Sequence, residues 1–298
     1  MSLSRLKNDD TKDTVSVKVA CLQTRLWPDY DSATAEAIDL ASQVDADTKV
    51  LFLPEYCGGL KTENSRFCPP ASDLASHPVL NSLRQYAADS SRWIVVGSIA
   101  VDPDSDGRYS NRGFVICEDG KIASSYSKIH LFDVQLSGDK VYRESDSVVP
   151  GDSLTLVDTP AGLLGHTICY DLRFPQLYRD LAQSGAEVLA IPAAFTRVTG
   201  EAHWHALCRS RAIENGAYVI APCATGPVAG GGEAYGHSLI IDPWGKVIAD
   251  GAIGPGVISA VIDTEQVRQA RKKIPSLQHD RRWQTVDTHP AASASVPR

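Results

Sequence analysis

The sequence lacks an apolar run long enough to cross a membrane. No stretch of the 298 residues approaches the roughly 18 consecutive apolar residues that indicate a spanning helix. The first residues also lack the apolar centre of a secretion signal, and Asp9, Asp10 and Asp13 are acidic residues that transit peptides avoid. We therefore expect no membrane partner and no targeting segment.

Positive charge is scarce as well. The chain has 29 Lys and Arg residues against 36 Asp and Glu residues, which gives a formal net charge of −7. The basic residues are dispersed along the chain, so the electrostatic footprint of a nucleic-acid-binding protein is missing. We do not expect nucleic acid as a partner.

The cysteines lack the spacing of a disulfide framework or of a zinc site. There are seven of them, an odd number, and no Cys-x-x-Cys motif occurs. Scattered cysteines of this kind indicate reduced thiols in a cytoplasmic protein. His203 and His205 form a His-x-His pair, but they fall in a helical pattern over residues 201–215, where residues two apart point in different directions. The sequence therefore predicts no metal site.

The chain also lacks an internal linker and a tandem repeat, and its length suits one large core. Residues 1–14 and 285–298 are polar or rich in small residues and show no periodicity, so we interpret them as loose tails around a single domain, residues 15–284. Within that domain, short β-rich runs alternate with longer helical patterns, which is typical of α/β proteins. The runs 50–53 and 188–191 are apolar at every position, which indicates strands covered on both faces. We predict a layered sandwich of sheets with helices outside.

One cysteine stands where a buried strand is predicted to turn into a helix. Cys169 follows a mostly apolar run, residues 162–168, and precedes Pro175, which suits the first position of a helix over residues 175–184. Its thiol would lie near the unsatisfied N–H groups at the positive end of the helix dipole, which favour a thiolate and an oxyanion. The alternative is the usual role of a single cysteine in an apolar segment, a small buried hydrophobic residue.

Two charged residues follow predicted strands in a similar way. Glu55 comes after the buried run 50–53 and Pro54, and Lys128 closes the predicted strand 122–126. A cysteine hydrolase needs a base for its thiol and a positive or N–H donor group for the oxyanion, and these two residues offer both. Each also has an ordinary explanation, because a Glu after a Pro often caps a turn and a Lys at a strand end is usually solvated.

Four separated motifs, taken together, resemble the nitrilase superfamily of carbon–nitrogen hydrolases. They occur in the order that the family shows: LPE at 53–55, YSKIHL at 126–131, RES at 143–145 and ICYDLRFP at 168–175. The resemblance extends from about Val17 to Trp283. It implies a four-layer αββα sandwich that forms a homodimer, and a chemistry that requires no metal and no organic cofactor.

The same resemblance implies a role for individual residues. Cys169 would be the nucleophile, Glu55 the base and Lys128 the group that stabilises the oxyanion. Glu144 matches a second glutamate that positions the substrate and the lysine. The backbone N–H of Tyr170 should complete the oxyanion site, which places this residue among those that bind substrate.

Within the superfamily, the chain looks like the Nit-type amidases, which include ω-amidases and deaminated glutathione amidases. The likeness rests on residues 128–133, 143–145 and 150–151, with residues 235–238 and 242–245 favouring the deaminated glutathione branch. We therefore expect a small-molecule substrate, a carboxylate-bearing amide such as deaminated glutathione or a related ω-amide of a 2-oxo acid. An N-carbamoyl or aliphatic amide is the alternative within the superfamily.

Two further residues and one loop are expected at the substrate pocket. Phe195, at the end of a matching segment, is expected to contact substrate. Arg173 lies four residues beyond the nucleophile, where a guanidinium can hold a substrate carboxylate or instead pair with Glu144 or Asp171. The loop 56–62 matches neither amidase branch, and it should line the pocket.

Two rival functions remain open. A histidine can be the base of a cysteine hydrolase, and His130 and His237 are the candidates. A protein with this fold can also bind or act as a scaffold without catalysis. The presence of Glu55, Lys128 and Cys169 argues against that second rival, because loss of activity should have allowed at least one of them to change.

Overall fold

The computed structural model describes residues 16–64, 66–102, 105–137 and 140–283. The expected tails, residues 1–14 and 285–298, lie outside the described residues. None of the helices in the described ranges has the length and apolar character to span a membrane.

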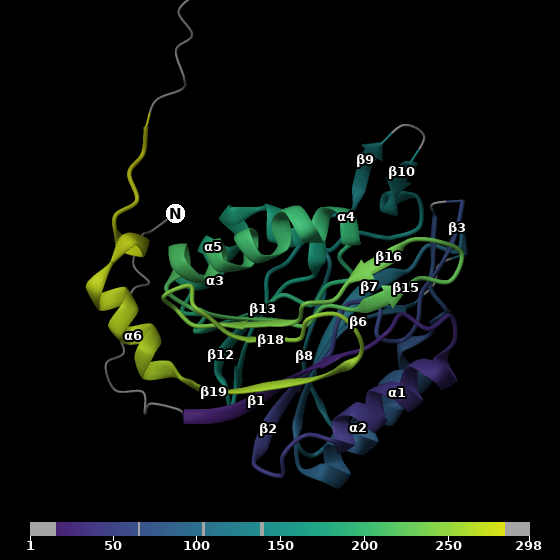
Figure 1. The fold of residues 1–298 in the computed structure, drawn as a ribbon, viewed down its shortest axis with the longest axis horizontal. Helices are drawn as coiled ribbons and strands as arrows, with labels where there is room; N and C mark the ends of the chain where they lie inside the picture. Colours follow the sequence, from purple (N-terminus) through teal and green to yellow (C-terminus); the bar gives the residue numbers. More distant parts are fainter. Residues whose placement is uncertain (1–15, 65, 103–104, 138–139, 284–298) are drawn as a thin grey trace, which may run out of the picture.

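Two β-sheets form the inner layers of the molecule (Figure 1). The strands of the first sheet are, in spatial order, β19 Gly256–Asp263, β1 Ser16–Gln23, β2 Thr48–Phe52, β6 Trp93–Val101, β7 Ser110–Ile116 and β8 Ile122–Ser127, with β5 Ala71–Ser72 beside β6. The strands of the second are β11 Leu156–Thr159, β12 Gly162–His166, β13 Val188–Ala190, β14 Tyr218–Ala221, β17 Leu239–Ile241 and β18 Val247–Asp250. Each sheet has three adjacent parallel strands near its centre, β1, β2 and β6 in one and β12, β13 and β14 in the other.

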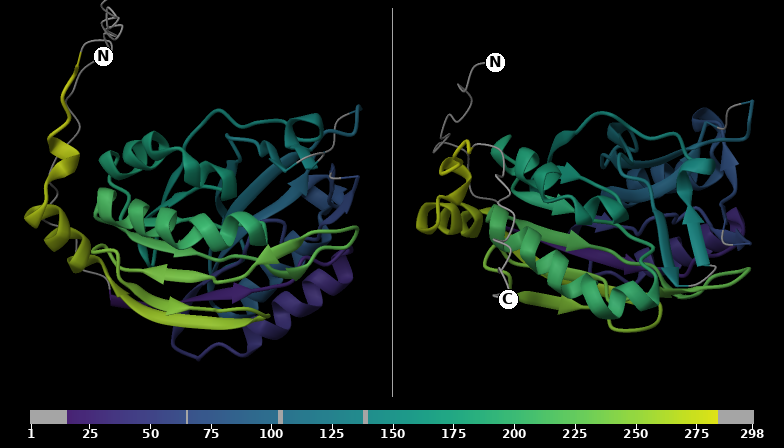
Figure 2. Two further views of the ribbon diagram at one scale, coloured as in Figure 1. Left: turned by 45° about the horizontal axis from the view of Figure 1, so that its top comes forward. Right: turned by 90° about the horizontal axis from the view of Figure 1, so that it is seen from above.

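Helices cover the outer face of each sheet (Figures 1 and 2). Helices α1 Tyr30–Ser42 and α2 Pro78–Ser90 pack on the first sheet, and α3 Pro175–Gln183 and α5 His205–Asn215 pack on the second. Helix α6 Thr264–Lys273 follows β19 at one end of the layers. The arrangement confirms the predicted four-layer αββα sandwich.

Alternate residues of one strand serve two different cores, which is why these strands are apolar throughout. Val50 and Phe52 of β2 point into the layer between the sheets, where Val188 of β13 also packs. Leu51 and Leu53 point the other way, toward α1 and α2. Fully burying one such side chain contributes about 1.5–3 kcal/mol, so both faces help to fix the strand in its register.

Three short hairpins were not expected from the sequence. The segment 128–151 contains β9 Asp133–Ser137 and β10 Lys140–Arg143, and the segment after Glu55 contains β3 Lys61–Glu63 and β4 Arg66–Cys68. A third pair is formed by β15 Thr225–Pro227 and β16 Glu233–Tyr235. These strands are too short and too polar for a period of two residues to stand out.

Candidate active site

Strand ends from both sheets meet at one place. Glu55 follows β2 by three residues, and the strand pairing continues past β2 because the Leu53 N–H donates to the Val95 carbonyl at 2.9 Å. In the second sheet, the Cys169 N–H donates to the Pro192 carbonyl at 2.9 Å, beyond the ends of β12 and β13. The Ala194 N–H donates to Glu55 Oε2 at 2.9 Å and thereby joins the two sheets. The carboxyl ends of parallel strands are where α/β proteins commonly place their binding sites.

Lys128 lies between two glutamates. Its Nζ is 2.8 Å from Glu55 Oε1 and 2.8 Å from Glu144 Oε2, and all three side chains are almost completely buried. Burial alone would lower the pKa of Lys128, but the negative charges of Glu144 and Glu55 outweigh it and hold the pKa well above its ordinary value. The structure thus brings Glu55, Lys128 and Glu144 together around one ammonium group.

Two residues that the sequence analysis did not single out complete this network. Asn111 of β7 donates its side-chain N–H groups to Glu55 Oε1 at 3.0 Å and to Glu144 Oε1 at 3.2 Å. The Tyr56 hydroxyl donates to Glu144 Oε1 at 3.0 Å. A buried carboxylate needs such donors, because an unsatisfied buried charge is costly. Neither residue carries a signal in the sequence, because Asn111 stands between the polar residues Ser110 and Arg112 and Tyr56 belongs to a loop.

Cys169 occupies a sharp bend between β12 and the helical segment that follows. It has a φ of +50°, in the left-handed region that costs a non-glycine residue about 1–2 kcal/mol, and it begins the short helix η3 Cys169–Arg173 ahead of α3. Buried Asp171 braces the bend, since its carboxylate accepts the Ile168 N–H at 2.9 Å and the Tyr126 hydroxyl at 2.7 Å. The N–H of Tyr170 lies in the first turn of η3, where helical N–H groups lack helical partners.

The thiol of Cys169 is neutral in the resting site. Burial and the negative charge of Glu55, with which it also forms a hydrogen bond, raise the pKa of Cys169 well above its ordinary value, although Lys128 lowers it. Burial and the carboxylate of Glu55 therefore outweigh the helix end, which by itself would favour a thiolate. The nucleophile must lose its proton as it reacts.

The groups proposed for catalysis face one cavity. Glu55, Lys128 and Cys169 line it, and most of the remaining wall is apolar or aromatic, with Tyr170 and Phe195 among the contributing residues. The loop 56–62 supplies Tyr56, Leu60 and Thr62 to the wall, which confirms that this loop lines the pocket.

Arg173 is not among the residues that line the cavity, but it contacts two of them. Its guanidinium carbon is 5.8 Å from the Tyr170 ring centre and 5.4 Å from that of Phe195, and its N–H groups lie 3.4 Å from His203 Nδ1. Its guanidinium therefore lies over two of the aromatic residues that line the cavity.

The histidines proposed as rival bases have other partners. His130 Nδ1 lies 2.8 Å from Asp171 Oδ1, and its ring stacks on Phe174 with centres 3.5 Å apart. His237 Nδ1 lies 2.9 Å from Asp250 Oδ1, and neither of these two residues is among those that line the cavity. Neither histidine is therefore arranged as the base for Cys169.

Comparison with known proteins places the chain in one family. Residues 18–272 match the family model described as carbon-nitrogen hydrolase. The deaminated glutathione amidase of Homo sapiens is 40% identical over 270 residues, which are 88% of this chain and 82% of the human protein. The omega-amidase NIT3 of Saccharomyces cerevisiae is 36% identical over 248 residues, 81% of this chain and 84% of the yeast protein.

Solved structures agree with this assignment. The Caenorhabditis elegans NitFhit protein superposes with a TM-score of 0.83 at 31% identity, over 91% of this chain and 66% of that one. Saccharomyces cerevisiae Nit3, described as a member of branch 10 of the nitrilase superfamily, gives 0.75 at 31% identity, over 88% of this chain and 95% of the yeast one. The chain belongs to the carbon–nitrogen hydrolase family of the nitrilase superfamily, and it is an amidase that hydrolyses carbon–nitrogen bonds.

Proposed function

We propose that the chain hydrolyses a small carboxylate-bearing carboxamide through a thioester on Cys169, with deaminated glutathione as the first candidate substrate and α-ketoglutaramate as the second. The observation that carries this proposal is the ammonium of Lys128, buried between Glu55 and Glu144 in the wall of a cavity that the Cys169 thiol also lines. A base, an oxyanion donor and a nucleophile are the three parts that acyl transfer to a cysteine needs.

In the first half of the proposed reaction, Glu55 accepts the thiol proton while the Cys169 sulfur attacks the amide carbonyl carbon. The oxyanion that forms is stabilised by the Lys128 ammonium and the Tyr170 N–H. Collapse of this intermediate breaks the carbon–nitrogen bond, and Glu55 returns the proton to the departing amine or ammonia.

In the second half, Glu55 takes a proton from water, and the resulting hydroxide attacks the thioester carbonyl. The acid leaves and the proton returns to the sulfur, so the free thiol is restored. Glu144 positions Lys128, because it accepts two hydrogen bonds from the Lys128 ammonium, at 2.8 Å and 3.0 Å. As the resemblance to the superfamily implies, it also positions the substrate. Every step uses groups of this chain and water.

The substrate class is supported by the relatives, whose names are deaminated glutathione amidase and omega-amidase. Tyr170 and Phe195 belong to the wall that a substrate would contact, and the Arg173 guanidinium places positive charge next to both rings. An N-carbamoyl or neutral aliphatic amide is the alternative substrate. A scaffold without catalysis receives no support from a cavity that holds all of these groups.

We further propose a cytoplasmic homodimer. The cytoplasm is supported by the seven cysteines, all of which are unpaired in the structure. The dimer is supported by the resemblance to the superfamily alone.

The test measures ammonia release from α-ketoglutaramate and α-ketoglutarate release from deaminated glutathione, next to a neutral aliphatic amide and a carbamoyl amino acid. We expect turnover of the two oxo acids, and complete loss of it in Cys169→Ala, a change that removes little volume and leaves the fold intact. Turnover of only the neutral or carbamoyl compound would contradict the substrate assignment. Ordinary amidase activity in purified Cys169→Ala would contradict the mechanism.

A further inference from the structure

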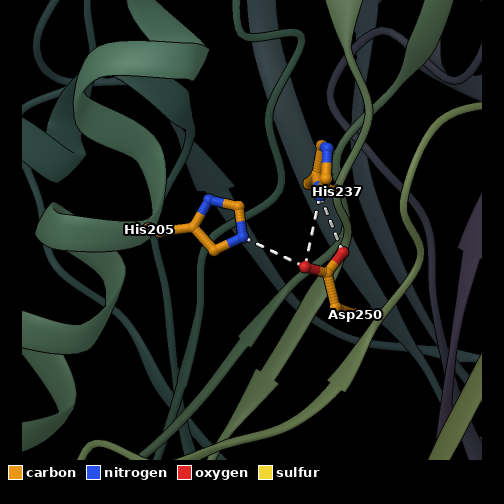
Figure 3. A group of neighbouring side chains, drawn as sticks. All are labelled: His205, His237 and Asp250. Atoms are coloured by element: carbon orange, nitrogen blue, oxygen red, sulfur yellow. Dashed lines mark hydrogen bonds and ion pairs between the residues drawn. The ribbon is translucent and has the colours of Figure 1, made fainter.

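Two histidines and an aspartate from distant parts of the sequence converge away from the cavity (Figure 3). His205 begins α5, His237 precedes β17, and Asp250 ends β18. The Nε2 atom of His205 lies 3.1 Å from Asp250 Oδ2, and the Nδ1 atom of His237 lies 3.2 Å from the same oxygen. One potential ligand atom from each residue falls within 4.8 Å of the other two, a grouping found nowhere else in the described ranges for three His, Cys, Asp or Glu side chains.

We propose that His205, His237 and Asp250 bind a divalent transition-metal ion of the zinc class. Two imidazole nitrogens and one carboxylate oxygen form a donor set that suits Zn²⁺ and Co²⁺ better than Ca²⁺ or Mg²⁺, which prefer oxygen ligands alone. Tetrahedral zinc with bonds of about 2.0 Å separates its ligand atoms by about 3.3 Å. The two nitrogen-to-oxygen distances already lie close to that value, and the two nitrogens lie within 4.8 Å of each other, so binding requires the imidazoles to move closer together by at most about 1.5 Å.

The surrounding backbone holds the ligands in place before an ion arrives. The Ala252 N–H donates to Asp250 Oδ1 at 2.8 Å, which leaves Oδ2 facing both imidazoles. The backbone of His237 is fixed on both sides, since its N–H donates to the Ala252 carbonyl at 2.7 Å and its carbonyl accepts the Trp204 indole N–H at 2.8 Å. Such outer contacts orient metal ligands and raise affinity.

The site is reachable from solvent. The exposed fractions of the side chains are 36% for His205, 35% for Asp250 and 22% for His237. Tyr235 stacks on the His237 ring with centres 4.6 Å apart and covers one side. Three protein ligands and an open side leave room for water as a further ligand.

The ion would act as a structural clamp rather than as a catalyst. It would tie the start of α5 to the hairpin of β17 and β18, and Trp204, which bonds the His237 carbonyl, packs against Phe195 of the cavity wall with ring centres 5.0 Å apart. The proposed chemistry at Cys169 uses none of these ligands. His203, the other member of the His-x-His pair, contacts Arg173 and not this group, which makes it a control.

The experiment adds Co²⁺ or Zn²⁺ to the full chain after treatment with a chelator, and compares His205→Gln with His203→Gln. Visible cobalt bands without a thiolate charge-transfer band would report a nitrogen and oxygen site. We expect binding with 1:1 stoichiometry and a zinc-dependent rise in the unfolding temperature, both retained by His203→Gln. His205→Gln should weaken binding by at least about 100-fold, since even outer-shell changes weaken it by 10–100-fold.

Asp250→Asn keeps the size of the side chain and serves as a second test if His205→Gln folds poorly. Its cobalt affinity should fall in the same way. Equal binding by the His205, His203 and parent proteins, a cobalt spectrum with thiolate bands, or no binding at all would each overturn the proposal. Amidase activity after chelation is a separate readout, because loss of the clamp should lower stability and leave the rate of the folded enzyme unchanged.

Discussion

At the scale of single residues, the site depends on the balance of positive and negative charge among its buried side chains. One ammonium, Lys128, neutralises parts of two carboxylates, and Asn111 donates to the same two groups. The charged members of this site could be predicted, because each follows a strand or belongs to a motif. Asn111 could not be, because its partners come from distant segments and a lone Asn in a strand has no chemical signature of its own.

Arg173 gives a test of charge recognition at this scale. Its guanidinium lies against Tyr170 and Phe195, and a carboxylate-bearing substrate in the cavity would sit within reach of its field. Arg173→Lys keeps the charge but removes the planar stacking and the bidentate geometry. We expect KM to rise several-fold for carboxylate-bearing amides and little for neutral ones, measured by steady-state kinetics.

Arg179→Lys is the control, because Arg179 pairs with Asp280 on the surface and does not line the cavity. It should leave both KM values unchanged. If Arg173→Lys raised KM equally for charged and neutral amides, Arg173 would be a support for the aromatic wall and not a carboxylate contact.

At the scale of elements, the pattern of apolar residues predicted those strands and helices whose positions are determined by burial of their side chains. The predicted strands at 50–53, 122–126 and 188–191 and the predicted helix over 175–184 agree with β2, β8, β13 and α3 to within about two residues. The short hairpins could not be predicted, because contacts with distant loops rather than local propensity hold them. One of them, the hairpin of β3 and β4, includes Thr62, which lines the cavity. The Thr62 N–H donates to the Ala229 carbonyl at 2.7 Å.

Gly97 of β6 shows how tightly the two sheets approach at the site. A Cβ atom there would lie 2.2 Å from the Leu53 carbonyl oxygen, 2.3 Å from that of Pro54 and 2.5 Å from the Pro192 side chain. Gly97→Ala must therefore displace the strand end that carries Glu55. We expect a loss of about 1–3 kcal/mol in the free energy of unfolding and a fall of about 100-fold in kcat.

Gly256→Ala in β19 is the matched control, because a Cβ atom at Gly256 meets no other atom within 4 Å. Urea denaturation and steady-state kinetics on both variants check the prediction. Parent-like kcat in Gly97→Ala would show that the strand end tolerates the shift and that Glu55 is not positioned by this contact.

At the scale of the whole molecule, the sandwich buries several thiols that its mechanism does not use. Cys21, Cys57, Cys208 and Cys223 are buried in the layers, and burial raises the pKa of each. The rise reaches a pKa of about 12 for Cys57 and for Cys223. The layering was predictable from the sequence, whereas the partners of these thiols depend on packing that no local pattern encodes.

These thiols make the fold sensitive to alkaline pH. A cysteine in the unfolded chain ionises near pH 8.5, while the buried thiol stays neutral until its much higher pKa. The contribution of these thiols to the free energy of unfolding is therefore constant below about pH 8.5. It falls as the pH rises from there toward the folded pKa, because ionisation of the thiol favours the unfolded chain. At pH 10, Cys57 and Cys223 should each reduce the free energy of unfolding by about 2 kcal/mol, and Lys128, which is still charged in both states, should add little.

Urea denaturation under reducing conditions at pH 8 and pH 10 measures this loss of unfolding free energy. In Cys57→Ala the loss should be smaller by the contribution of that one thiol. Equal free energies at the two pH values would mean that water reaches these thiols, contrary to a sandwich whose layers are closely packed.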